Sequence, residues 1–188
     1  YIRFGMWSEI VALAQPEDKE LYVTTNALIY YAKAVALANL GRHEEAKAAM
    51  AHFTTAYAKV PESRMLFNNK ARDVLALAEE MMKGEIDFKA ARREEGLDHL
   101  RKAVDLDDNL EYEEPWSWPQ PTRHALGALL MEAGEYNEAE AAYRADLDEI
   151  ITLLDRGDTG AILAWLAPRQ AAYDRYRQAK GALDPPPV

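Results

Sequence analysis

The chain has 188 residues, 49% of them hydrophobic, which is enough to bury a substantial core and excludes an intrinsically disordered protein. Acidic residues outnumber basic ones by 32 to 22, and the net charge of -10 repels nucleic acid and anionic lipid, so we expect neither as a partner. The chain has no cysteine, which excludes disulfides, thiolate zinc sites and cysteine nucleophiles.

No apolar run approaches the roughly 20 residues that cross a bilayer, so we expect no membrane span. No signal peptide is recognisable, and this favours the cytoplasm. The chain begins at Tyr1 rather than Met, however, so an absent upstream leader or domain would leave the compartment unknown.

Hydrophobic positions follow a helical period almost throughout, and no run alternates between apolar and polar residues as a strand would. The sequence therefore predicts an all-α chain that folds as a single domain over residues 1–188. Gly41 ends the first long helix, and Pro61 follows the second. The predicted helices are 21–40, 43–59, 64–90, 93–106, 121–133 and 136–154, which form pairs at 21–60, 64–106 and 121–154.

Three segments fall outside these pairs. Residues 107–120 form an acidic loop rich in Trp and Pro. Residues 159–181 predict two short helices that cap the chain, and 182–188 form an extended tail with three prolines.

One position near the start of each second helix recurs along the chain. Its occupants are separated by 36, 50 and 43 residues, so the repeat is recognisable but irregular. They are Ile10, Ala46, Gly96 and Ala139.

The last pair carries the most specific pattern. Small residues stand where two helices would cross closely, at Gly127 and Ala139, and bulky residues surround them. The bulky residues are Leu126, Leu130, Tyr136, Tyr143 and Leu147, and Gly134 lies in the turn between the two helices. This pattern resembles the tetratricopeptide repeat (TPR), most closely a multi-repeat protein of bacterial type.

The TPR resemblance implies a right-handed α-solenoid of antiparallel helix pairs, here about three pairs plus an N-terminal half-repeat at 1–20 and the C-terminal helical cap. It further implies a non-catalytic scaffold that holds a protein or peptide, of unknown identity, on its concave face without a cofactor. Phe4, Gly5, Trp7 and Ile10 match the turn and second helix of a repeat. Because such a half-repeat leaves an apolar edge uncovered, we expect either a fragment of a longer array or a homodimer formed through this edge.

By the same resemblance, the concave face is lined by the first helix of each pair. Methionine and aromatic side chains there suit an apolar peptide, and the alternative is that the same residues pack internally. The positions that clamp a carboxylate in some TPR co-chaperones hold apolar residues and an acid here, which does not support that role. The groove positions are Leu28, Tyr31, Val35, Asn39, Met81, Glu85, Phe88, Lys89, His124, Ala128, Met131 and Glu132.

Trp116 and Trp118 lie in the loop at 107–120 and have two interpretations. They form a recognition surface for a Pro-rich or cationic ligand, or they fold back as anchors that cover the edge of the predicted helices at 93–106 and 121–133. We favour the anchor, because an exposed pair of tryptophans promotes aggregation.

Metal and catalytic motifs are incomplete. His43 begins a sequence like that of a zinc-protease helix, but Lys47 replaces the second histidine. Asp105, Asp107 and Asn109 resemble the start of a calcium loop that lacks its glycine and its closing glutamate. We therefore predict no catalytic residue, no metal and no enzyme activity.

Overall fold

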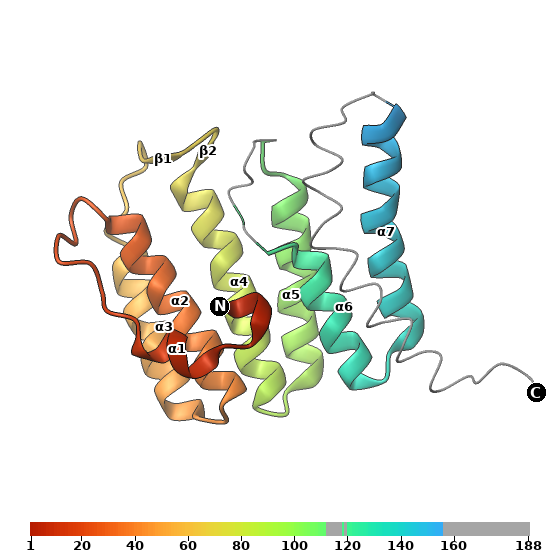
Figure 1. Cartoon of the computed structure of the whole chain (residues 1–188), viewed down its shortest axis with the longest axis horizontal. Coiled ribbons are helices and arrows are strands. Elements are labelled where there is room, and N and C mark those ends of the chain that lie inside the picture. The colour runs from red at the N-terminus through yellow and green to blue at the C-terminus, as the bar shows by residue number, and fades with distance from the viewer. Residues whose placement is uncertain (112–117, 119, 156–188) are drawn as a thin grey trace, which may run out of the picture. The chain divides into compact units, whose positions relative to one another are not determined.

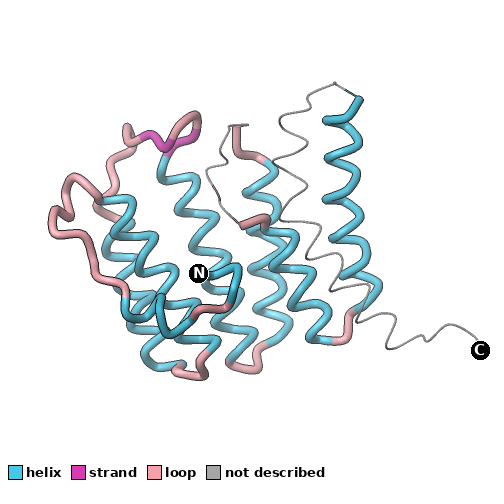
Figure 2. The backbone as a smooth tube through the Cα atoms, in the orientation of Figure 1, coloured by secondary structure: helices cyan, strands magenta, loops and turns pink. Residues whose placement is uncertain are grey.

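The computed structural model describes residues 1–111, 118 and 120–155, with side chains as far as residue 147. This part of the chain is mostly helical, so the predicted all-α fold is confirmed (Figure 1, Figure 2). The predicted cap and tail at 159–188, and most of the Trp-Pro loop, lie outside the described residues. The elements are η1 (Ile2–Phe4), α1 (Trp7–Ala12), α2 (Val23–Asn39), α3 (His43–Tyr57), β1 (Met65–Leu66), β2 (Asn69–Lys70), α4 (Ala71–Lys89), α5 (Arg93–Asp108), α6 (Thr122–Ala133) and α7 (Tyr136–Asp155).

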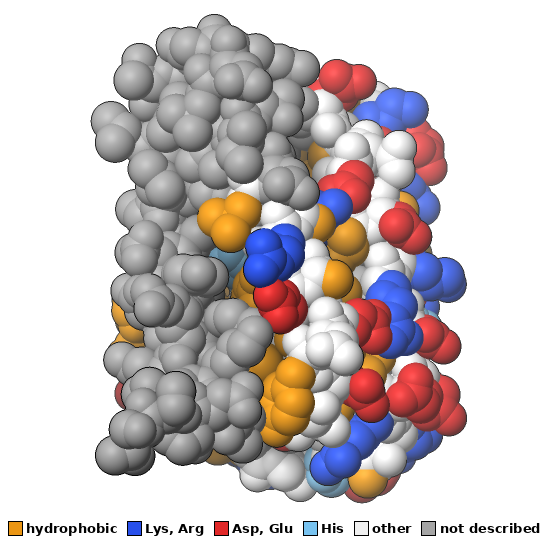
Figure 3. Space-filling model, turned by 90° about the vertical axis from the view of Figure 1, so that its right-hand side faces the viewer, with side chains coloured by type: hydrophobic (Ala, Val, Ile, Leu, Met, Phe, Trp, Pro, Cys, Tyr) orange, Lys and Arg blue, Asp and Glu red, His pale blue; other side chains and the backbone are white. Residues whose placement is uncertain are grey.

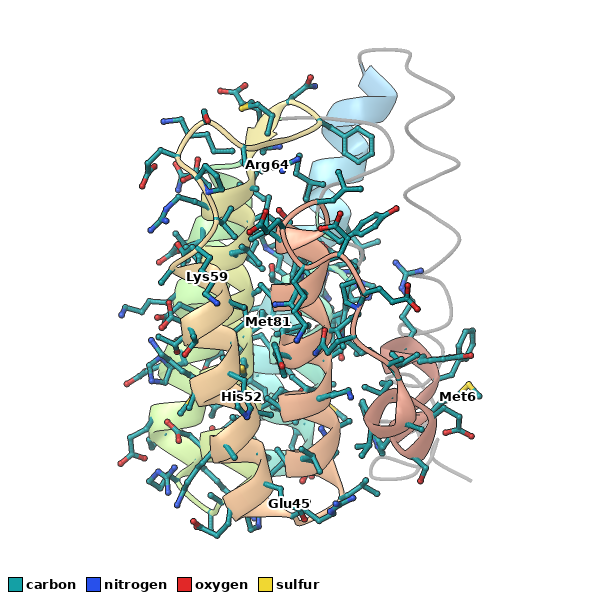
Figure 4. All side chains as sticks on the ribbon, turned by 90° about the vertical axis from the view of Figure 1, so that its left-hand side faces the viewer. Met6, Glu45, His52, Lys59, Arg64 and Met81 are labelled. Atoms are coloured by element: carbon teal, nitrogen blue, oxygen red, sulfur yellow. The ribbon has the colours of Figure 1, made fainter. Side chains whose placement is uncertain are left out.

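The chain divides into two compact units, Tyr1–Thr122 and Arg123–Val188. In the first unit, α2 pairs with α3 and α4 pairs with α5, and the first helices of these pairs, α2 and α4, also pack on each other. Helix α1 packs on α2 from the side opposite α3, as Figure 4 shows. The second unit contains α7 and all but the first residue of α6.

Four turns between helices in the described chain share one geometry. In each, a residue one or two positions past the end of the first helix has a positive φ, and the next amide donates to the carbonyl five residues earlier, which is the Schellman ending of a helix. The turn residues are Gly5 (φ 63°), Gly41 (73°), Ala91 (67°) and Gly134 (87°). The corresponding N···O distances are 3.0 Å for Met6 to Tyr1, 2.9 Å for Arg42 to Leu37, 2.9 Å for Arg92 to Asp87 and 2.9 Å for Glu135 to Leu130.

A β-hairpin precedes α4, and the prediction of a helix from residue 64 is wrong in this respect. β1 and β2 pair antiparallel around a two-residue turn, and α4 begins only at Ala71. The amide of Ala71 donates to the carbonyl of Arg64 (2.8 Å), which closes the base of the hairpin. Figure 2 shows the two strands in magenta at the start of α4. Each strand has only two residues, too few for an alternating pattern to reveal it.

The close crossing predicted in the last pair is present between α6 and α7. A Cβ at Gly127 would lie 2.6 Å from Cζ of Tyr143, so only glycine fits beneath that ring. Ala139 is fully buried. In the first unit, the largest fully buried side chains are Ile10, Val35, Phe53, Leu75, Leu77, Met81, Met82, Ile86, Leu97 and Leu100.

Candidate functional site

Most apolar members of the predicted groove on α2 and α4 are core residues, whereas Leu28 is partly exposed. Tyr31, Val35 and Phe88 are buried, and Met81 is only 1% exposed. Figure 4 places Met81 between the helices rather than on an outer face. Burial favours the internal-packing alternative for these residues, because a ligand reaches them only if the helices separate.

The polar members of the same set remain accessible and lie together. The side-chain amide of Asn39 on α2 donates to Oε2 of Glu85 on α4 (3.2 Å) and to the carbonyl of Val35 (3.0 Å). Asn39, Glu85 and Lys89 are all partly exposed, and Nζ of Lys89 lies 5.5 Å from the centre of the Phe88 ring. The structure thus brings three of the predicted groove residues onto neighbouring parts of α2 and α4.

Tyr31 lies beneath this polar group. Burial raises the pKa of its hydroxyl far above the ordinary value of 10.0, and the negative charge of Glu85 raises it further. The phenol therefore stays neutral at any physiological pH. It provides a hydroxyl in the core, not a reactive phenolate.

Trp118 packs on Tyr31. The two ring centroids are 5.1 Å apart in an edge-on arrangement, and Trp118 is 3% exposed. This favours an anchor over an exposed recognition surface for Trp118, although Tyr31 is on α2 and not on either of the two helices that the prediction named. Its indole Nε1 is buried and has no hydrogen-bond partner within the described part of the chain. Trp116 lies outside the described residues.

In the second unit, His124 takes part in an internal contact. Its Nε2 lies 2.7 Å from Oδ2 of the buried Asp146, and its ring meets that of Tyr143 edge-on at 6.0 Å. Met131 is partly exposed, and Glu132 and Ala128 are exposed. His124 therefore links α6 to α7, while Met131 and Glu132 remain available as surface positions.

A charged cluster between α4 and α5 was not predicted as a unit. Nδ1 of His99 lies 2.6 Å from Glu80, and its Nε2 lies 3.7 Å from Asp87. Partial burial raises the pKa of Glu80, but the hydrogen bond with His99 and the charge of Lys83 lower it by more, so the net pKa is below the ordinary 4.5. The cluster joins two packed helices, and helical spacing alone does not show which charges face each other across them.

The described residues hold neither a candidate metal site nor a candidate membrane span. Among the described residues, no group of three or more His, Asp or Glu side chains is arranged to hold a metal ion. No helix in the described part is long and apolar enough to cross a membrane. In the view of Figure 3, acidic and basic side chains interleave over the described surface.

The comparison with protein families decides the class of the repeat. The family model described as Tetratricopeptide repeat matches residues 27–59, which span most of α2 and all of α3. The chain contains a tetratricopeptide repeat. No curated protein and no solved structure shows a significant match to the chain.

The TPR match covers the helix pair that contains Ala46. Ala46 lies 36 residues after Ile10, which is the shortest of the three intervals between the recurring positions. TPR proteins are generally non-catalytic scaffolds for protein interactions, and this is the class that the match supports here. The positions that the resemblance assigns to a carboxylate clamp are Tyr31, Val35 and Met81, which are buried, and the acidic Glu85. This arrangement does not provide the cationic side chains that bind a peptide carboxylate.

Proposed function

We propose that the chain is a non-catalytic scaffold that holds a peptide of a partner protein on the face of α2 and α4 around Asn39, Glu85 and Lys89. The observation that carries this proposal is the hydrogen bond of 3.2 Å between Asn39 and Glu85, which joins an amide on α2 to a carboxylate on α4 beside the buried side chains of Tyr31 and Val35.

The chemistry of this face defines the peptide. A partly buried carboxylate attracts a cationic side chain or a backbone N–H more strongly than a solvated one, because less water competes with it. The amide of Asn39 provides both a donor and an acceptor for a peptide backbone. Rigid helices carry all three groups, so binding requires little ordering of the scaffold.

The test uses two substitutions that change charge by the same amount. Glu85→Gln removes the carboxylate from the proposed face, and Glu44→Gln does so on the exposed surface of α3. Each immobilised chain is exposed to a lysate of the source organism after circular dichroism has shown equal helicity. A protein retained by the parent and by Glu44→Gln but lost with Glu85→Gln supports the proposal. Equal retention by all three chains rejects this face.

The alternative function is homo-oligomerisation through the N-terminal segment. Ile10 is buried within the chain itself, whereas Phe4 is 82% exposed and Tyr1 is also exposed. We infer that any self-association uses Phe4 and Tyr1 rather than Ile10. Sedimentation equilibrium over a range of concentrations tests this: a mass that rises with concentration in the parent and not in Phe4→Ser supports it, and a constant monomer mass rejects it.

A further inference from the structure

The hairpin before α4 has an inner face and an outer face. Met65 pairs with Lys70 and Leu66 pairs with Asn69, and successive side chains of a strand point to opposite faces. Asn69 is buried and Leu66 is partly buried, whereas Met65 is 51% exposed and Lys70 is exposed. The hairpin therefore turns Met65 and Lys70 toward solvent.

The inner face is held firmly in place. The side-chain amide of Asn69 donates to the carbonyl of Glu111 (2.9 Å), and the amide of Glu111 donates back to Oδ1 of Asn69 (2.8 Å). At the base, the guanidinium of Arg72 donates to the carbonyl of Val60 (2.9 Å) and pairs with Glu62 (2.9 Å). The hydrogen bonds on both sides hold the hairpin tip in one position before any partner arrives.

The tip presents an aromatic side chain in a backbone conformation that L-residues rarely adopt. Phe67 has a φ of 52°, which favours glycine in a two-residue hairpin turn, and the residue is 62% exposed. Phenylalanine here contributes little to the core and strains the backbone. Strained residues held in place by their surroundings concentrate at functional sites.

The tip is also basic in an acidic protein. The net charge of the chain is -10, but residues 59–72 contain four basic residues and one acidic residue, and Arg72 is paired with that residue, Glu62. The remaining basic residues, Lys59, Arg64 and Lys70, are all exposed. None of the three forms an ion pair with a carboxylate within the described residues. Figure 4 labels Lys59 and Arg64 on the segment that joins α3 to α4.

We propose that the hairpin, through Met65, Phe67, Arg64 and Lys70, together with Lys59 on the segment before it, is a docking surface for an acidic segment of a partner protein that also carries an aromatic or aliphatic side chain. Exposed aromatic residues provide most of the contact energy at protein interfaces, and complementary charge selects the partner and speeds its association. An acidic partner fits because the net charge of -10 repels it from the chain as a whole, whereas the exposed basic side chains at the hairpin attract it locally. The surface is separate from Asn39, Glu85 and Lys89, so it does not depend on the function proposed above.

The test titrates the isotope-labelled full chain with a synthetic peptide of alternating Glu and Leu residues around a central Phe, followed by amide chemical shifts. We expect the shifts to map to residues 64–70 and to weaken with added salt. Phe67→Gly removes the aromatic ring and suits the turn, so the fold is retained; it should raise the half-saturation concentration roughly tenfold. The charge variant Lys59→Glu, Arg64→Glu, Lys70→Glu should abolish the response, and Glu85→Gln should leave it unchanged.

Other outcomes overturn the proposal. Shifts that map elsewhere, or an absence of shifts, show that the tip does not recognise an acidic apolar segment. Unchanged binding by Phe67→Gly shows that the aromatic ring is not a contact. Co-sedimentation with vesicles of phosphatidylserine and phosphatidylcholine, without peptide binding, assigns the basic tip to a membrane surface instead.

Discussion

Gly84 on α4 and Gly96 on α5 meet backbone to backbone where the two helices cross. A Cβ on Gly84 would lie 3.0 Å from the carbonyl oxygen of Gly96, and a Cβ on Gly96 would lie 2.8 Å from that of Gly84. A Cβ on Gly96 would also lie 2.7 Å from the amide nitrogen of Phe88. Because these neighbours are backbone atoms, they cannot rotate aside as a flexible side chain would.

Gly96→Ala should therefore destabilise the chain. We expect the free energy of unfolding to fall by about 1–3 kcal/mol, since the added methyl group forces α4 and α5 apart. Urea denaturation followed by circular dichroism measures the change. Alanine is a better helix former than glycine, so a rise of about 1 kcal/mol would show that the crossing tolerates the methyl group.

Ala91→Gly should stabilise the chain. Ala91 has a φ of 67° at a turn where Gly5, Gly41 and Gly134 occupy the equivalent positions. Removing the Cβ relieves the left-handed strain, so we expect a gain of about 1 kcal/mol in the same denaturation assay. The control is Ala51→Gly, on the exposed side of α3, which should cost about 1 kcal/mol. The same sign for both substitutions would refute the argument from strain.

Asn69→Ala should loosen the hairpin. It removes both hydrogen bonds to the backbone of Glu111 and leaves those groups without their present partner, at a cost of about 1–3 kcal/mol. Hydrogen exchange should become faster at the amide of Glu111. Asn69→Asp keeps the acceptor but places a buried carboxylate oxygen against the carbonyl of Glu111, so at neutral pH it should loosen the hairpin at least as much as Asn69→Ala. Unchanged exchange in Asn69→Ala would show that the hairpin is held by its base alone.

Stability should fall in acid partly through Glu80. Its pKa in the folded chain is below the ordinary 4.5, so its contribution is fully present above that value and is lost as the pH falls through the folded pKa. In Glu80→Gln, the free energy of unfolding should therefore fall less steeply as the pH is lowered. Denaturation curves recorded at a series of pH values from neutral to below pH 4 measure this slope. Glu94→Gln, an exposed substitution on α5, serves as the control. An equal slope in the parent and in Glu80→Gln would remove Glu80 from the acid response.

The predicted groove residues differ in exposure. Asn39 and Glu85 lie together because α2 and α4, the first helices of two successive pairs, pack on each other. Met81 and Phe88 were placed on the same face and are buried. Helical periodicity shows which residues share a side of a helix, but it does not show how closely the next helix or loop covers that side.

The amino-acid sequence by itself determined the helices, their pairing and the turns between them, because these depend on local periodicity, on small residues and on glycine at positive φ. Only the tertiary structure decided which side of each first helix is buried, that Trp118 packs on Tyr31, and that residues 65–70 form a hairpin. These features depend on contacts between distant parts of the chain, such as Asn69 with Glu111, which no local pattern encodes. The exposure of Phe67 is likewise a product of that long-range anchoring.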